Sequence, residues 1–139
     1  MAFTVRPFQD RDEPAVVVLW RAVFPNGPAR NDPANIIARK RRVQPELFLV
    51  GEVDGAIVAT VLPGYDGHRG WVYHVAVAPG VRRRGYGRTM MAAAEERLRA
   101  LGCPKLNLQI NRWNADVVAF YESLGYAVED RVSMGKAFA

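Results

Sequence analysis

An arginine- and glycine-rich segment is the stretch of this chain whose residue types and spacing best fit chemistry with a ligand. Residues 81–88 read VRRRGYGR, between a β-prone apolar run and a helically spaced apolar stripe. This places the segment at the start of a helix. A helix N-terminus favours an anion, glycine lets a ligand approach the backbone closely, and arginine donates charge-assisted hydrogen bonds. The segment therefore predicts a phosphate site in preference to a solvated basic turn.

Two common phosphate-binding patterns do not fit this segment. The chain contains no GxxxxGK[ST] run, which the nucleotide-hydrolysing P-loops need. It also lacks GxGxxG, since Gly85-Tyr86-Gly87 is followed by Arg88, Thr89 and Met90. ATP hydrolysis and nicotinamide redox chemistry thereby lose their main support.

Hydrophobic periodicity and turn residues predict the elements that must position the segment. In chain order we expect a strand at 2–8, a helix from Asp10 that stops near Pro25, a helix from Pro33 through Arg42, strands at 47–53, 56–62 and 71–77, a helix ending at Gly102, a strand at 105–110, a helix from Asn114 to Leu124 and one or two strands within 126–138. This order predicts an α/β fold with a mixed sheet (α+β), formed by a single domain over residues 1–139.

Three apolar stripes and two local signals support these elements. Asp10 and Glu13 have capping-box spacing, and Asp54-Gly55 is a pair that a type I′ hairpin turn favours. The stripes with helical spacing are Val16, Leu19, Trp20 and Val23; Met91, Ala94, Leu98 and Leu101; and Val117, Phe120, Tyr121 and Leu124.

Length and charge narrow the class of protein. The 139 residues are half apolar and 24% charged, which suits one compact domain stable without a metal or disulfide. The formal net charge of +5 favours polyanionic partners such as nucleic acid, an anionic membrane surface or a phosphorylated cofactor.

Cysteine usage and hydropathy indicate a compartment. The single cysteine, Cys103, forms no internal disulfide, and with only two histidines it builds no zinc site, so we expect no metal and an inert thiol. Residues 1–10 have no apolar signal region, and no run is long enough to span a membrane. We expect a cytoplasmic protein.

The phosphate segment resembles the acyl-CoA signature of the GNAT superfamily of N-acetyltransferases, [QR]-x-x-G-x-[GA]. The matching residues are Arg82-Arg83-Arg84-Gly85-Tyr86-Gly87, and the preceding Val75-Ala76-Val77-Ala78-Pro79 is similar to the strand before that loop. A second block is similar to the family's N-x(5)-FYxxLGF/Y pattern: Asn114, Phe120, Tyr121, Leu124, Gly125 and Tyr126. The likeness covers nearly the whole chain. The hairpin, the GYDGHRG loop at 64–70 and the GCPK run at 102–105 look closest to the small bacterial acetyltransferases called YpeA-like.

The resemblance implies a fold and an activity. The fold would be the GNAT acyl-CoA N-acyltransferase fold, with a central mixed sheet of about six to seven strands and about four helices. The activity would be transfer of an acetyl group from acetyl-CoA, as co-substrate, to a primary amine of a small molecule, peptide or protein by direct attack. Family members often dimerise, so the resemblance leaves a homodimer open.

The resemblance also implies roles for residues at matching positions. The main chain of Val75, Ala76 and Val77 would bind the pantetheine arm, and Asn114 would contact it. Tyr121 would protonate the departing thiolate, although its place in an apolar stripe also suits a core aromatic. The pyrophosphate would be held by Arg82, Arg83, Arg84, Gly85, Tyr86, Gly87 and Arg88.

The general base is the weakest part of the pattern. Many family members place a glutamate on the strand that is 71–77 here, and this strand contains no acidic residue. His74 is the first candidate because its ordinary pKa suits a base, with a structural histidine as the alternative. The other candidates are Tyr73, Glu52, Asp66, His68 and a relay of ordered water.

Two readings from other classes stay open beside the enzyme. A GNAT-like module that binds acyl-CoA without catalysis agrees with the missing carboxylate. An RNA-associated basic protein agrees with the net charge, but four of the 19 basic residues lie within 82–88 and no RNA-binding motif occurs. The loops at 25–35 and 64–70, which would help to select the acceptor, carry no readable code.

Overall fold

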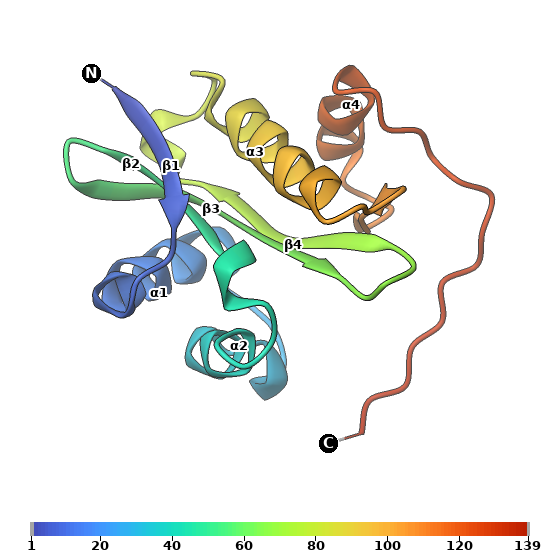
Figure 1. Ribbon diagram of the computed structural model, residues 1–139, viewed down its shortest axis with the longest axis horizontal. Helices are drawn as coiled ribbons and strands as arrows, with labels where there is room; N and C mark the ends of the chain where they lie inside the picture. The colour runs from blue at the N-terminus through green and yellow to red at the C-terminus, as the bar shows by residue number, and fades with distance from the viewer. Residues whose placement is uncertain (1, 139) are drawn as a thin grey trace. The chain divides into compact units, whose positions relative to one another are not determined.

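The computed structural model of the protein describes residues 2–138, in two compact units that divide between Leu108 and Gln109 (Figure 1). The larger unit contains a five-stranded sheet in the order β1-β2-β3-β4-β5. The strands are β1 (Phe3–Pro7), β2 (Leu49–Val53), β3 (Ala56–Tyr65), β4 (Gly70–Val77) and β5 (Leu106–Asn107). The first four pair antiparallel, and β5 pairs parallel to β4.

Three helices cover the two faces of this sheet (Figure 1). They are α1 (Glu13–Val23), α2 (Pro33–Lys40) and α3 (Tyr86–Ala100). Val50 packs in the cluster formed with α1 and α2, whereas a side chain at its neighbour Gly51 would meet Met90 of α3. Successive strand residues point to opposite faces, so α1 and α2 lie on one face and α3 on the other.

The core on the α1 side supports β4. It contains Val16, Leu19, Trp20, Ile36, Ile37, Phe48, Val50, Leu62 and Ala76. Its rings are stacked, with centroids 4.3 Å apart for Phe8 and Phe48 and 5.8 Å apart for Phe48 and Trp20. This aromatic stack holds α1 against the middle of the sheet.

Several local predictions are confirmed. Asp54 and Gly55 have φ of 51° and 82°, as a type I′ turn requires, and they join β2 to β3. Asp32 is the N-cap residue of α2, with proline in the first turn. Gly102 has φ of 83° after α3, and the Cys103 N–H returns to the Leu98 carbonyl at 3.1 Å.

The capping box predicted for Asp10 and Glu13 is wrong. The turn begins one residue earlier, and the Gln9 N–H donates to Asp12 Oδ2 at 2.8 Å. Asp10 and Glu13 instead pair with Arg41, at 3.1 and 2.6 Å. The 3₁₀ turn over Asp10–Asp12 shifts the cap by one residue, a change that the spacing of acidic residues does not reveal.

The sheet is smaller than predicted. The strand expected at 105–110 shortens to Leu106–Asn107, and residues 126–138 form no strand. Val128, Val132, Met134 and Phe138 are each more than three-quarters exposed. A strand forms where another strand pairs with its backbone, and a local pattern cannot supply that partner. Leu101, expected in a buried stripe, lies beyond the end of α3 and is half exposed.

The smaller unit, 109–138, contains the helix α4 (Ala115–Ser123). Asn114 is its N-cap residue, as predicted, and its carbonyl accepts the first helical hydrogen bond from Val118, but its side chain does not cap the helix. In the predicted stripe only Tyr121 is buried. Gly125 ends the helix with φ of 95°. No helix within residues 2–138 has the length and apolar character that crossing a membrane requires.

Gly51 tests how the start of α3 is held. A Cβ there would lie 2.4 Å from the Phe3 ring, which is stacked on Tyr86 with centroids 4.2 Å apart. We expect Gly51→Ala to lower the free energy of unfolding by about 1–3 kcal/mol, because the ring can move only by breaking that stack. The measurement is urea denaturation. The strand control is Gly64→Ala, whose Cβ would meet only ordinary contacts at 3.7 and 3.9 Å. Equal stabilities of the two variants would contradict the view that the Phe3–Tyr86 stack holds the start of α3.

Candidate functional site

A β-bulge bends β4 at His74. Leu62 of β3 pairs with Tyr73, but Thr60 pairs with Ala76, so two residues of β4 oppose one residue of β3. His74 has φ of 49°, in the left-handed region that a non-glycine residue rarely adopts. An extra residue on one strand reverses the alternation that follows it.

The reversed alternation decides which backbone groups face the outer edge of β4. The Ala78 N–H bonds to the Val58 carbonyl of β3, so the backbone groups of Ala76 also face β3. Those of Val75 and Val77 therefore point away from it. Of the three residues predicted to bind a ligand through their main chain, only these two present free-edge groups.

The outer edge of β4 is open along its second half. β5 pairs only with Gly70 and Trp71, so within the described N-terminal unit no strand covers β4 from Val72 onward. The Val77 carbonyl accepts a 3.3 Å hydrogen bond from Arg82 Nε. An open edge of this kind can hydrogen-bond an extended ligand as an added strand would.

Two buried side chains hold the bulge, and the sequence did not identify either as part of the site. Trp20 Nε1 donates to Thr60 Oγ1 at 2.8 Å, and Thr60 Oγ1 donates to the His74 carbonyl at 2.8 Å. The sequence signal that could have identified this contact is Thr60, the one polar residue in the apolar run AIVATVL at 56–62. A buried hydroxyl needs hydrogen-bond partners, so its presence in a core strand marks a polar contact.

The arginine- and glycine-rich segment lies at the start of α3, as predicted. Gly85 is the N-cap residue with φ of 81°, and Arg83 has φ of 66°. The first helical hydrogen bond joins the Thr89 N–H to the Gly85 carbonyl at 3.1 Å. The amides of residues 86–88 therefore have no acceptor within the helix. Space around Gly85 is open, because a Cβ added there would meet no atom within 4 Å beyond its chain neighbours.

The charge of this segment is not neutralised. Arg82, Arg83, Arg84 and Arg88 are exposed, and none forms an ion pair with an acidic side chain of residues 2–138. Elsewhere Arg6, Arg21, Arg41 and Arg99 are paired with carboxylates. Four unpaired guanidinium groups at the positive end of a helix dipole form a strong anion-binding environment.

His74 lies on the α1 side of the sheet. Its ring contacts Trp20 and Phe24, with centroid distances of 4.6 and 5.0 Å. Burial lowers the pKa of His74 from 6.5 to about 4. The ring is therefore neutral at pH 7 and is a weak base, whereas a general base works best with a pKa near the working pH.

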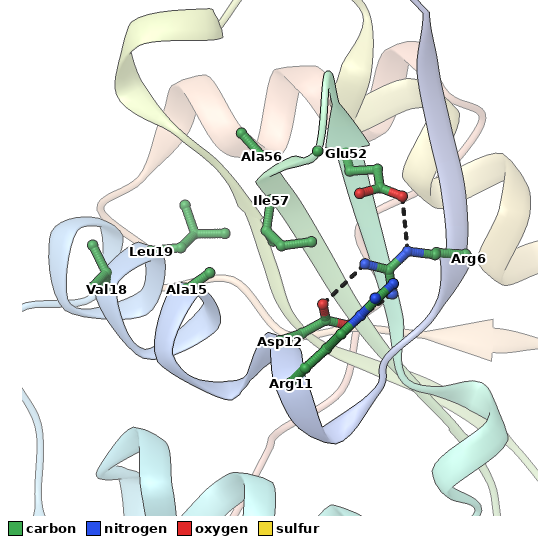
Figure 2. A pocket seen from close by; sticks show the side chains of 10 residues that line it. Arg6, Arg11, Asp12, Ala15, Val18, Leu19, Glu52, Ala56 and Ile57 are labelled. Carbon is green, nitrogen blue, oxygen red and sulfur yellow. Dashed lines mark hydrogen bonds and ion pairs between the residues drawn. The ribbon is translucent and has the colours of Figure 1, made fainter.

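The acidic base candidates are engaged elsewhere. Figure 2 shows Arg6 between Glu52 and Asp12, in an open pocket beside α1 and the β2–β3 hairpin. Arg6 donates to Glu52 at 2.9 Å and to the two oxygens of Asp12 at 2.7 and 2.9 Å. The hydrogen bonds from Arg6 hold the pKa of Asp12 below its usual value, against the effect of burial.

The β3–β4 turn accounts for two more candidates. Asp66 accepts hydrogen bonds from the amides of His68 and Arg69, both at 2.8 Å. These amides lower the pKa of Asp66, so its carboxylate stabilises the exposed turn. Tyr73, another of the candidates for the general base, lies on β4 outside this turn, and its side chain is 54% exposed.

The smaller unit carries the remaining predicted residues, Asn114 and Tyr121. The Tyr121 ring contacts Phe120 and Tyr126 edge to face, at 5.0 and 5.7 Å. Burial raises the pKa of Tyr121 to about 12. The phenol is therefore fully protonated at neutral pH and able to donate a hydrogen bond.

Neither the thiol nor a metal cluster adds to the site. Cys103 is half-buried, its Sγ donates to the Lys105 carbonyl at 3.3 Å, and a side chain at Gly70 would meet the sulfur at 2.8 Å. Among the described residues, no three His, Cys, Asp or Glu side chains gather where they could hold a metal ion.

Comparison with known proteins identifies the family. The model of the acetyltransferase (GNAT) family matches residues 14–126. An acetyltransferase of Yersinia enterocolitica is 44% identical over 132 residues, which cover 95% of this chain and 93% of the relative. The chain therefore belongs to the acetyltransferase (GNAT) family, and its class of enzyme is acyltransferase, as predicted.

Solved structures show the same fold at low identity. Ard1 from Thermoplasma volcanium has a TM-score of 0.83 at 24% identity, with coverage of 93% of this chain and 85% of that one. The PaiA N-acetyltransferase from Thermoplasma acidophilum, in complex with coenzyme A, has a TM-score of 0.81 at 17% identity, with coverage of 95% and 94%. The predicted mixed α/β GNAT fold is confirmed, with five strands in place of six to seven.

The burial of His74 makes stability depend on pH. Between pH 6.5 and about 4 the unfolded chain protonates this imidazole while the folded protein keeps it neutral, so stability falls as the pH falls. Relative to His74→Asn, the wild type should lose up to about 3 kcal/mol between pH 7 and pH 4. Asparagine tolerates the positive φ at this position. Urea denaturation across this pH range measures the effect, and parallel pH profiles would refute it.

Proposed function

We propose that the protein is an N-acetyltransferase that transfers the acetyl group of acetyl-CoA directly to a primary amine. One observation carries the proposal: the open half of β4 is followed by a helix N-terminus bearing four unpaired arginines. The amide-rich arm of CoA suits the free edge of a strand, and its pyrophosphate suits the helix start. The PaiA structure, solved with coenzyme A, supports this reading.

The charge of the chain agrees with such a ligand. CoA carries about four negative charges, two on the pyrophosphate and close to two on the 3′-phosphate. Four of the 19 basic residues lie between Arg82 and Arg88, and without them the formal net charge of +5 would be +1. The excess positive charge is therefore concentrated where the phosphates would bind.

The proposed binding roles follow the geometry of each residue. Val75 and Val77 would hydrogen-bond the pantetheine arm, and Arg82 would release the Val77 carbonyl as the arm enters. Ala76 would contribute packing, since its backbone groups face β3. Asn114 would contact the arm, as in the family pattern. The pyrophosphate would be held by Arg82, Arg83, Arg84, Gly85, Tyr86, Gly87 and Arg88.

The proposed reaction is a direct displacement at the thioester carbon. The amine nitrogen attacks this carbon, the carbon–sulfur bond breaks, the nitrogen loses a proton and the sulfur gains one. A backbone N–H near Val77 would polarise the thioester carbonyl. No acyl-enzyme is needed, and Cys103 is already engaged with the Lys105 carbonyl.

Proton removal from the amine is assigned to water. His74 was the first candidate, but its pKa of about 4 makes it a poor proton acceptor, and Glu52 and Asp66 are hydrogen-bonded elsewhere. The acceptor must then enter largely as the neutral amine. An α-amino group with a pKa near 8 is roughly 10% neutral at pH 7, whereas a lysine-like amine is less than about 0.1% neutral.

Tyr121 is proposed to assist the departing sulfur. With a pKa of about 12, complete proton transfer to a thiolate, whose thiol has a pKa near ~8.5, is uphill by about three to four pKa units. Tyr121 would therefore donate a hydrogen bond to the charge that develops on sulfur, and solvent would complete the protonation.

Gly85 and Gly102 provide a matched test at opposite ends of α3. Both have φ near 80° and open space around them, so glutamate costs similar backbone strain at either position. Gly85→Glu should weaken acetyl-CoA binding at least about 100-fold, because it places bulk and negative charge among donors worth about 1.5–3 kcal/mol each. Gly102→Glu should bind as the wild type does.

Calorimetry measures this binding, and release of free thiol across a panel of α-amino, alkyl and polyamine acceptors measures catalysis. Equal affinity in both variants would reject the phosphate site. Acetyl-CoA binding by the wild type without thiol release would instead indicate a non-catalytic acyl-CoA module. Salt-dependent retention of RNA that Gly85→Glu does not change would favour the RNA-associated reading.

Tyr121→Phe tests the leaving-group role. We expect the turnover number to fall about tenfold or more, since one hydrogen bond to a charged group is worth about 1.5 kcal/mol or more, with acetyl-CoA affinity retained. The control is Ser123→Ala, which removes an exposed hydroxyl of the same helix, one that donates to the Phe120 carbonyl. Steady-state kinetics and calorimetry separate the two effects, and full turnover in Tyr121→Phe would remove this residue from the mechanism.

A further inference from the structure

A buried chain of two hydrogen bonds links α1, β3 and β4. Trp20 Nε1 donates to Thr60 Oγ1, and Thr60 Oγ1 donates to the His74 carbonyl, both at 2.8 Å. An indole nitrogen can only donate, so the threonine hydroxyl accepts from it and gives its single hydrogen to the carbonyl. Trp20 is 1% exposed and Thr60 0%, so water cannot replace either group.

The bulge depends on this chain because its backbone is both strained and interrupted. His74 adopts φ of 49°, and a bulge leaves the extra residue outside the ladder of strand hydrogen bonds. The His74 carbonyl therefore lacks a partner in the ladder, and the hydroxyl of Thr60 donates the hydrogen bond that replaces it. The His74 ring is fixed from the same side by Trp20 and Phe24.

The position of the bulge selects the groups at the open edge. Gly70 donates its N–H to Lys105 beside β5, so an unbroken strand would also turn the groups of Ala76 outward. Because the bulge intervenes, Val75 and Val77 turn outward instead, and Ala76 packs in the core beneath α1. Loss of the bulge would therefore change both the edge and the core.

We propose that Trp20 and Thr60 are positioning residues for acyl-CoA binding, which fix the bulge at His74 so that Val75 and Val77 present their backbone groups to the ligand. The proposal rests on the function proposed above. Neither side chain would touch the ligand, since both are buried between α1 and the sheet. They would act through the backbone of Val75 and Val77, so their loss would lower the affinity for acetyl-CoA and also the turnover, because a backbone N–H near Val77 would polarise the thioester carbonyl.

Thr60 offers a matched pair of variants. Thr60→Val keeps the shape but removes the hydroxyl, and we expect it to raise the Kd and KM for acetyl-CoA about tenfold, a change of about 1.4 kcal/mol. Thr60→Ser keeps the hydroxyl and should stay within about twofold of the wild type in Kd, KM and kcat.

A further variant separates positioning from general loss of stability. Ile37→Val removes one buried methyl group of the same core from a residue that takes no part in the hydrogen-bond chain, and it should lower stability without changing the Kd. Trp20→Phe should raise the Kd less than Thr60→Val, and the double variant should be no weaker than Thr60→Val alone, because the chain is already broken. If Thr60→Val does not fold, Trp20→Phe and Thr60→Ser carry the comparison.

The outcomes distinguish this proposal from the function on which it rests. A wild type that does not bind acetyl-CoA overturns both. If the wild type binds acetyl-CoA and both Thr60→Val and Trp20→Phe bind it as tightly as the wild type does, the positioning role alone is overturned. A loss of affinity in Ile37→Val equal to that in Thr60→Val also overturns it, because the effect would then follow stability.

Discussion

The hydrogen bond from the Thr60 hydroxyl to the His74 carbonyl is the interaction on which the rest of the site depends. It holds a residue in the left-handed region inside a strand, and the resulting bulge reverses the alternation of β4. The reversal directs Val75 and Val77 to the open edge and Ala76 into the core. One buried hydroxyl thereby links the packing of α1 to the surface that faces the proposed ligand.

Desolvation sets the chemistry of His74 and Tyr121, two of the titratable groups considered for catalysis. Burial lowers the pKa of His74 and raises that of Tyr121, and both shifts favour the neutral form. Neither group is suited to complete proton transfer near pH 7. The proposed mechanism is consistent with this: it needs an amine that enters neutral, a hydrogen bond to the leaving sulfur and proton exchange with water.

Local features were predictable because their signals lie within a few residues of one another. The hairpin at Asp54-Gly55, the start of α2 at Asp32 and the helix end at Gly102 each follow from the φ or capping preference of the residue present. The arginine segment at the start of α3 was predicted for the same reason. The resemblance carried by 82–87 and by the block from Asn114 to Tyr126 led to the correct family.

By itself, then, the sequence determined the family, the order of the helices and strands, and the candidate phosphate segment. Only the tertiary structure decided the bulge at His74, the engagement of Glu52 by Arg6 and the loss of the expected strands in 126–138. The physical reason is sequence separation: Arg6 meets Glu52 across 46 positions and Trp20 meets Thr60 across 40. Local periodicity and turn preference carry no information about such partners, which exist only once the sheet has formed.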